Sequence, residues 1–199
     1  MNRNANSWLL LLTLLAIMLL TIGCSKSGTS SLIATPAAMH SVQVTAGGFQ
    51  ILVPTTWRFT DRNPSMGSGA TLIGSITSPT ILNGAYGDFF KSEATFTSLA
   101  EVAEWGRTVK LFGQTTNRVD GYKELYTSPM TFQNEETWIR EFTYTSSSPL
   151  TGTITGHVLD NYRLHQDHGI ILRFYTDESN YQSLQSYFRQ MIDSLTYIR

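Results

Sequence analysis

The chain has 199 residues, of which 41% are hydrophobic and 15% are charged. This composition is apolar enough for one globular domain and excludes a disordered, highly charged polymer. The 14 Lys and Arg residues nearly balance the 15 Asp and Glu residues, and no basic run occurs, which argues against a nucleic-acid-binding protein. The single cysteine excludes a disulfide within the chain and a four-cysteine zinc site.

The N-terminal segment has the pattern of a secretory signal peptide. Arg3 precedes an apolar run from Trp8 to Ile22. This run is shorter than the roughly 20 residues that a helix needs to cross a hydrocarbon core. The pattern therefore favours the apolar region of a signal peptide over a permanent membrane span.

The apolar run ends in Thr21-Ile22-Gly23-Cys24, which resembles the lipobox of bacterial lipoproteins. Gly23 is the small residue that precedes the invariant cysteine of that motif, whereas Thr21 replaces its usual leucine. The resemblance implies that residues 1–23 are removed, that the Cys24 sulfur carries diacylglycerol, and that its amino group is fatty-acylated, as with palmitate. The alternative is an uncleaved N-terminal membrane helix with an incidental cysteine.

The residue after the cysteine bears on the destination of the protein. Ser25 stands where an aspartate retains lipoproteins of Gram-negative bacteria in the inner membrane. The resemblance therefore implies the outer membrane, with the protein facing the periplasm. Residues 24–40 are rich in small and hydroxyl side chains and predict a flexible tether, which leads to one domain over residues 41–199.

The first half of this domain shows strand signals and then a helix. Alternating apolar residues on both sides of Gly47-Gly48 predict a hairpin. Residues 70–77 and 86–94 predict two further strands, the second at a sheet edge. Ser98 and Glu101 have capping-box spacing, and the apolar periodicity that follows predicts a helix over 98–112.

The second half predicts four strands and a helix. The strands are expected at residues 122–127, 137–145, 153–163 and 169–176. A helix capped by Ser179 follows, with one apolar face formed by Tyr181, Leu184, Phe188, Met191 and Leu195. Short antiparallel strands with separately placed helices predict an α+β fold, in which a mostly antiparallel β-sheet packs between helices.

The order of these elements resembles the PsbP-like family. The matching stretches are residues 49–57 (FQILVPTTW), residues 98–101, Asp120-Gly121-Tyr122 and residues 191–195. The resemblance covers about residues 41–199 and implies an α/β/α sandwich. It also implies a binding or assembly role, because the family includes extrinsic photosystem subunits and small bacterial lipoproteins and offers no conserved catalytic motif.

Two groups of residues are candidate sites within the domain. A metal-site hypothesis joins histidines and carboxylates that are close in sequence, namely His157, Asp160, His165, Asp167 and His168. The alternative is that they are polar residues of a turn and a wet sheet face. A second hypothesis is an outward aromatic–arginine patch that receives a partner, formed by Trp138, Arg140, Arg173 and Tyr175. The alternative is that these side chains build the core.

The sequence predicts a non-enzymatic protein. Gly67-Ser68-Gly69 lacks the full spacing of a nucleophile elbow, and no nucleotide-binding glycine motif occurs. The leading hypothesis is a membrane-anchored lipoprotein of the bacterial cell envelope with an envelope protein as partner and no cofactor beyond the lipid on Cys24. The alternative is a lipoprotein that binds a small ligand or a metal in the sheet–helix cleft or at the hairpin of His165 and His168.

Overall fold

The computed structural model describes residues 38–62, 69–79, 84–111, 114–132, 135–148 and 152–198. These residues belong to one compact unit, Ala37–Arg199. Cys24 and the predicted signal peptide lie outside the described residues. The first strand begins at Met39, so the folded part starts slightly before the predicted boundary between tether and domain.

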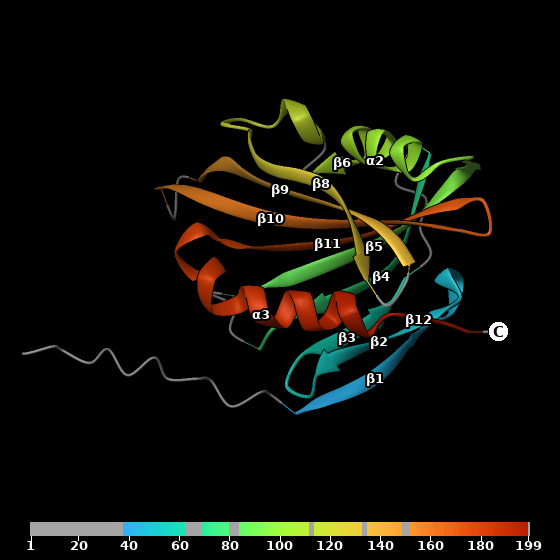
Figure 1. The fold of residues 1–199 in the computed structure, drawn as a ribbon. Coiled ribbons are helices and arrows are strands. Elements are labelled where there is room, and N and C mark those ends of the chain that lie inside the picture. The colour runs from blue at the N-terminus through green and yellow to red at the C-terminus, as the bar shows by residue number, and fades with distance from the viewer. Residues whose placement is uncertain are drawn as a thin grey trace, which may run out of the picture. The chain divides into compact units, whose positions relative to one another are not determined.

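The domain is built on a seven-stranded antiparallel sheet (Figure 1). In spatial order the strands are β3 (Arg58–Asp61), β4 (Ala70–Thr77), β5 (Tyr86–Thr95), β11 (His168–Asp177), β10 (Gly152–His165), β9 (Glu135–Ser148) and β8 (Lys123–Phe132). Six of these strands were predicted, and β3 was not. Strand β5 lies in the interior of the sheet, next to β11, and not at an edge.

The predicted N-terminal hairpin is confirmed, but it belongs to a separate small sheet. Strands β1 (Met39–Val44) and β2 (Phe49–Pro54) pair antiparallel on the two sides of a short 3₁₀ turn, η1 (Thr45–Gly47). Strand β2 also pairs with β12 (Thr196–Tyr197) near the C-terminus. The first and the last strands of the described residues, β1 and β12, therefore flank β2 in one three-stranded sheet.

Helix α2 (Leu99–Thr108) is shorter than predicted. The chain becomes extended at Val109, and β6 (Lys110–Leu111) then pairs with β7 (Gln114–Thr115), which leads into the 3₁₀ turn η2 (Thr116–Arg118). Val109 and Leu111 are both buried. Residues two apart share one face of an extended segment, so burial there overrode the helical spacing that the sequence suggested.

The N-terminus of α2 is capped as predicted. The Ser98 hydroxyl accepts a hydrogen bond from the Glu101 amide at 3.3 Å. The Glu101 carboxylate reaches back and accepts a bond of 2.8 Å from the Thr97 amide, one residue earlier than the Ser98 amide of a standard capping box.

We expect Ser98→Ala to lower the free energy of unfolding by about 1 kcal/mol, because one amide of the first turn loses its acceptor. Chemical denaturation measures this change. Ser186→Ala, at an exposed position in the middle of α3, is the matched control and should leave stability unchanged or slightly raised. Equal stability of the Ser98 variant and the parent protein would contradict the assigned cap.

Helix α3 (Glu178–Ser194) carries the predicted apolar face, with Tyr181, Phe188 and Met191 buried. It begins two residues earlier than expected, because Asp177 rather than Ser179 occupies the N-cap position. The Asp177 side chain makes no capping hydrogen bond. The first turn of α3 is instead held by a contact of Glu178, described below.

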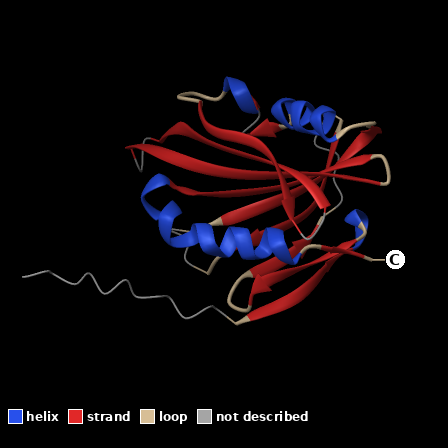
Figure 2. Cartoon of the chain, viewed as in Figure 1, coloured by secondary structure: helices blue, strands red, loops and turns tan. Residues whose placement is uncertain are grey.

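The two helices cover opposite faces of the large sheet (Figures 1 and 2). Neighbouring residues of a strand point to opposite faces, and on β10 Tyr162 packs under α2 while Arg163 bonds to the Ile192 carbonyl of α3. The small sheet packs on the α3 side, where Phe49, Ile51 and Phe188 share one core cluster. The domain is therefore mostly antiparallel β-sheet with two helices, richer in strand than a balanced α+β fold.

Candidate functional site

A buried charge cluster lies under α2, at the centre of the large sheet. Asp160 on β10 is fully buried, and its strand partners are Arg140 on β9 and Arg173 on β11. Arg173 donates to both Asp160 oxygens, at 2.7 and 2.9 Å, and Arg140 donates to Oδ2 at 2.8 Å. Two buried guanidinium groups thus share one carboxylate.

Two further groups complete this cluster. The Tyr162 hydroxyl donates to Asp160 Oδ2 at 2.5 Å, and the Gly106 carbonyl of α2 accepts from Arg140 at 3.3 Å and from Arg173 at 3.2 Å. Burial raises the pKa of Asp160, but the guanidinium groups outweigh this effect and hold the pKa below its ordinary value. The cluster therefore keeps Asp160 ionised and fixes α2 to the sheet.

The predicted outward patch is replaced by this interior arrangement. Arg140, Arg173 and Tyr175 are buried, and only Trp138 is partly exposed. Tyr175 stacks on Tyr86 with ring centroids 4.3 Å apart. The reason is that α2 and the segment after it cover the sheet face on which these side chains lie. Alternating aromatic and arginine residues on these strands therefore belong to a covered face of the sheet and not to a face exposed to solvent.

His157 forms a second polar cluster at the N-terminus of α3. Its Nε2 lies 3.0 Å from Glu141 Oε1 on β9, and its Nδ1 makes a short contact with Glu178 of α3. Its ring stacks on Tyr181 with centroids 3.4 Å apart. The buried ring thereby fastens the first turn of α3 to the sheet.

We expect Glu141→Gln to remove part of the acid sensitivity of the fold. Burial raises the pKa of Glu141, but bonds from His157 and Tyr181 outweigh it and hold the pKa below its ordinary value of 4.5. The ionised form thus stabilises the fold above pH 4.5, and this contribution is lost as the pH falls through the lowered pKa.

Chemical denaturation across pH 3 to 7 tests this expectation. The variant should be about 1 kcal/mol less stable at neutral pH, because a charge-assisted hydrogen bond is lost, and the difference from the parent protein should shrink in acid. Glu136→Gln, at an exposed position on the same strand, is the control and should show no such convergence. A constant difference at all pH values would contradict the assigned role of Glu141.

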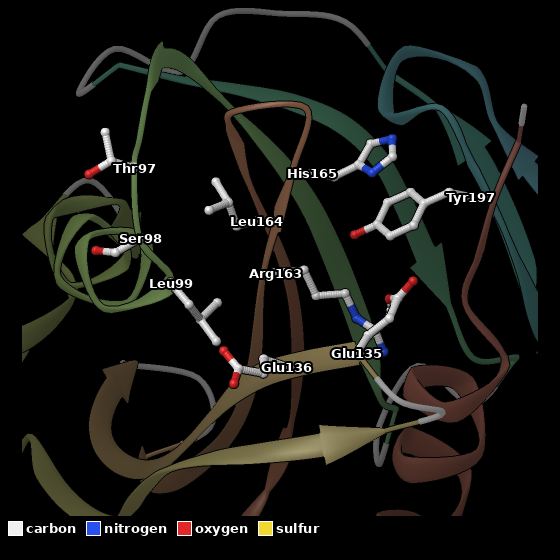
Figure 3. Close-up of a pocket in the computed structure, with 9 residues that line it drawn as sticks. All are labelled: Thr97, Ser98, Leu99, Glu135, Glu136, Arg163, Leu164, His165 and Tyr197. Atoms are coloured by element: carbon white, nitrogen blue, oxygen red, sulfur yellow. Dashed lines mark hydrogen bonds and ion pairs between the residues drawn. The ribbon is translucent and has the colours of Figure 1, made fainter.

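A polar cavity of about 630 Å³ opens where the start of β9 and the end of β10 approach the start of α2 (Figure 3). Arg163 and His165 of β10, Glu135 and Glu136 of β9, Ser98 and Tyr197 are among the residues that line it. Arg163 donates to Glu135 at 3.0 Å and to the Ile192 carbonyl at 2.8 Å. His165 stacks on Tyr197 with ring centroids 3.6 Å apart, and burial lowers the pKa of this histidine.

The residues of the metal hypothesis are not brought to one point. Asp160 is bound by the arginines, and His157 lies between its two glutamates. His165 faces the polar cavity, while the ring of His168 lies 3.1 Å from the Ser92 carbonyl. Asp167 is exposed in the hairpin turn with a φ of 62°. Within the described ranges, no group of three or more His, Cys, Asp or Glu residues is arranged to hold a metal ion.

Several residues of these clusters were missed by the sequence analysis. Gly106, Glu141, Glu178 and Arg163 each make a contact that defines one of them. The predicted hairpin loop of residues 164–168 did not fix which β10 residue faces which β11 residue, because the structure has a two-residue turn at Gln166-Asp167. The sequence also contains no signal for contacts made by the helices.

The part of the chain that the structure describes contains no helix long and apolar enough to cross a membrane.

Comparison with known proteins identifies the fold. No family model and no curated protein sequence matches the chain. Among solved structures, cyanobacterial PsbP (CyanoP) of Synechocystis sp. PCC 6803 is similar with a TM-score of 0.56 at 12% identity, over 82% of this chain and 95% of CyanoP. LpqN of Mycobacterium tuberculosis, a protein involved in cell envelope biogenesis, gives 0.49 at 14% identity, over 83% of this chain and 93% of LpqN. The likeness to CyanoP shows a PsbP-like fold and nothing beyond the fold.

Proposed function

We propose that the protein is a non-enzymatic lipoprotein of the bacterial cell envelope, which binds an envelope protein through its PsbP-like domain. The observation that carries the proposal is Cys24: the only cysteine of the chain stands directly after an apolar run and a small residue. The PsbP-like fold is compatible with this role, because it supplies a rigid sheet covered by helices on which a binding surface can be built.

In this proposal the lipid on Cys24 anchors the protein to the outer membrane, facing the periplasm. One acyl chain gives only marginal membrane binding, whereas two or more anchor stably. The segment between Cys24 and β1 then connects the anchor to the folded domain. The domain itself needs no membrane-spanning element to act at the membrane surface.

We expect Cys24→Ser to abolish lipidation. Cells grown with labelled palmitate should incorporate label into the parent protein and none into the variant, because the acceptor sulfur is gone. Ser25→Ala, at the neighbouring position, is the control and should be labelled like the parent. Equal labelling of the cysteine variant, or no labelling of the parent, would contradict the proposed anchor.

The surface of edge strand β8 offers a place to look for a partner. Leu125 and Tyr126 of β8 are 43% and 44% exposed, and β8 lies at one end of the large sheet. A photo-crosslinking amino acid at position 126 of the full-length lipoprotein, used in intact native membranes, should capture one specific envelope protein. The same amino acid at Ser186 on α3 is the control. Absence of a specific product at several exposed positions would contradict the binding role.

Binding of a small polar ligand is a second candidate function. The cavity lined by Arg163, Glu135 and His165 has a volume within the range of about 300–1,000 Å³ that is usual for ligand sites. A thermal-shift screen of small polar metabolites should then identify a compound whose effect is lost in His165→Ala. A screen without such a compound, together with a specific cross-linked protein, would decide in favour of the partner-binding role.

A further inference from the structure

One carboxylate of the polar cavity at the start of α2 has no counter-ion. Glu135 and Glu136 both line the cavity. Glu135 accepts a hydrogen bond from Arg163 at 3.0 Å. Glu136 is exposed and points the other way, towards Leu99 (Figure 3). Within the described ranges, the Glu136 side chain makes no ion pair and no hydrogen bond. Its carboxylate is therefore an open acceptor on the cavity wall.

The arginine of the cavity is already bonded to other acceptors. Arg163 is 4% exposed, and each of its three guanidinium nitrogens has an acceptor. Nε donates to Asn161 at 2.9 Å, and Nη1 donates to Glu135 at 3.0 Å. Nη2 donates to the Ile192 carbonyl at 2.8 Å. These bonds hold Arg163 beside Glu135, so it neutralises that carboxylate and not the carboxylate of Glu136.

The charge balance of the cavity favours a cation. Its charged lining consists of two glutamates and one arginine, and His165 is neutral at neutral pH because burial lowers its pKa. Two charges next to the lining cancel each other, since Lys91 lies near His165 and Glu101 caps the start of α2. One negative charge, that of Glu136, is left over. A cavity with an excess of one sign of charge raises the local concentration of counter-ions, which here are cations.

The rest of the wall suits a cation that carries hydrocarbon. Leu99 and Leu164 are the apolar lining residues, and His165 stacks on Tyr197 with ring centroids 3.6 Å apart. The neutral His165 ring does not repel a cation, and tyrosine rings attract cations. Hydrocarbon gains free energy when leucine side chains remove it from water. The cavity of about 630 Å³ therefore has room and partners for a ligand with both a charge and an apolar stem.

A metal ion fits the same groups poorly. Calcium takes about six to eight oxygen ligands and magnesium requires near-octahedral geometry, so both need oxygens that converge on one point. The side chains of Glu135 and Glu136 diverge instead (Figure 3). None of the residues that the structure describes forms a group of three or more His, Cys, Asp or Glu side chains able to hold a metal ion. The unpaired carboxylate thus favours a cation that needs only one anionic partner.

We propose that this cavity binds a primary alkylammonium group, whose N–H groups donate to Glu136 and whose hydrocarbon stem packs on Leu99 and Leu164. Hydrogen bonds between an ammonium group and a carboxylate are charge-assisted and roughly twice as strong as neutral ones. The group belongs to a free amine or to a lysine side chain. The inference rests on the second candidate function, ligand binding in this cavity, and names the chemical class of that ligand.

Calorimetric titration of the detergent-solubilised full-length protein with three compounds of equal stem length tests the proposal. At neutral pH butylamine is a cation, butanol is neutral and butyrate is an anion. We expect saturable binding of butylamine, followed to about 100 mM because so small a ligand binds weakly. Butanol and butyrate at matched ionic strength should bind at least tenfold more weakly. Absence of saturable butylamine binding, or equal binding of butanol or butyrate, would overturn the proposal.

The same titrations separate this proposal from the function on which it rests. If butylamine fails while another polar compound binds and is lost in His165→Ala, the alkylammonium class is wrong and ligand binding in the cavity stands. If butylamine fails and the metabolite screen also finds no compound, both the class and the ligand-binding function are wrong.

Three variants locate the site. Glu136→Gln removes the unpaired charge at an exposed position and should weaken butylamine binding at least tenfold. Glu136→Asp retains the charge and should bind more tightly than the glutamine variant. Asp61→Asn removes one negative charge at an exposed position on β3 and should bind like the parent. Circular dichroism checks folding, and parent-like binding by folded Glu136→Gln would overturn the proposal.

Lysine derivatives distinguish the two sources of the ammonium group. Nα-acetyl-lysine N-methylamide carries the butylammonium stem on a peptide-like frame. Binding at least as tight as that of butylamine indicates a lysine side chain as the natural ligand, whereas binding at least tenfold weaker indicates a free amine. The same compound with an acetylated side-chain amine has lost the charge and should not bind. Equal binding of the acetylated compound would show that the cavity does not recognise the ammonium group and would overturn the proposal.

Discussion

Asp160→Asn is expected to lower the free energy of unfolding by about 3–5 kcal/mol, the usual cost of removing one partner from a buried ion pair. The substitution keeps the shape of the side chain and removes its charge. Arg140 and Arg173 then remain buried without a counter-ion, since both bond to this carboxylate. Typical domains are stable by only about 5–15 kcal/mol, so this one change brings the fold close to unfolding.

Chemical or thermal denaturation of purified protein measures the effect of Asp160→Asn. The matched control is Asp167→Asn in the exposed hairpin turn, where the backbone has a φ of 62° that asparagine tolerates well. We expect the control to change stability by less than about 0.5 kcal/mol. Similar stabilities of the two variants would show that Asp160 does not balance the buried arginines.

Gly106→Ala is the second substitution with a large expected effect. It should destabilise the protein, whereas an exchange of glycine for alanine within a helix usually stabilises it. In an ordinary helix, alanine is about 1 kcal/mol more favourable than glycine. At this position of α2 a Cβ atom would overlap the ring of Tyr162 and lie 2.8 Å from its Cζ. Tyr162 is fully buried and bonded to Asp160, so the ring has little freedom to move away. We expect a loss of about 1–3 kcal/mol, as for other overpacked cores.

Denaturation also tests this second prediction, with Ala100→Gly as the control for helix propensity. Ala100 is exposed on the same helix, so its exchange for glycine should lower the free energy of unfolding by about 1 kcal/mol. Tyr162→Leu in the Gly106→Ala background shortens the opposing side chain, and the two losses should then be clearly less than additive. A Gly106→Ala protein more stable than its parent would contradict the close approach of α2 to the sheet.

The sequence predicted the strands and helices well where the apolar periodicity was long. The hairpin before Pro54, strands β9 to β11 and the apolar face of α3 all follow patterns with a period near 2 or 3.6. The prediction failed at residues 109–111, where a few apolar residues fit both periods and only tertiary packing decides between them. Strand β3 was not predicted, because a strand of four residues is too short to show a recurring apolar pattern.

The charge cluster was not predicted from the sequence, because the predicted strands 153–163 and 169–176 leave a five-residue loop between them. In the structure a two-residue turn at Gln166-Asp167 pairs His165 with His168, and counting five residues outwards from each places Asp160 opposite Arg173. The pairing itself therefore follows from the hairpin. The burial of this ion pair does not follow from the hairpin, because whether alternating arginines face water or a core depends on what covers the sheet. Here α2 covers it, and its Gly106 carbonyl completes the site.

The His157 cluster could not be predicted for a different reason. Glu141, His157 and Glu178 come from three separate elements, and the side chain of Glu178 reaches the ring only because α3 begins directly after β11. The contact depends on the direction in which α3 leaves the sheet. That direction is set by the packing of Phe188 and Met191 on the opposite end of the helix, which local sequence does not encode.

The position of β2 between β1 and β12 has a consequence for the order of folding. Phe49 pairs with Tyr197, and the Leu52 amide donates to the Ser194 hydroxyl at 2.9 Å. Contacts between distant parts of a chain form slowly, because a long loop must close first. A chain still emerging from the ribosome has the β1–β2 hairpin but not the residues that pair with the other edge of β2. That edge stays open until Thr196 and Tyr197 have been synthesised, and the small sheet cannot be completed before then.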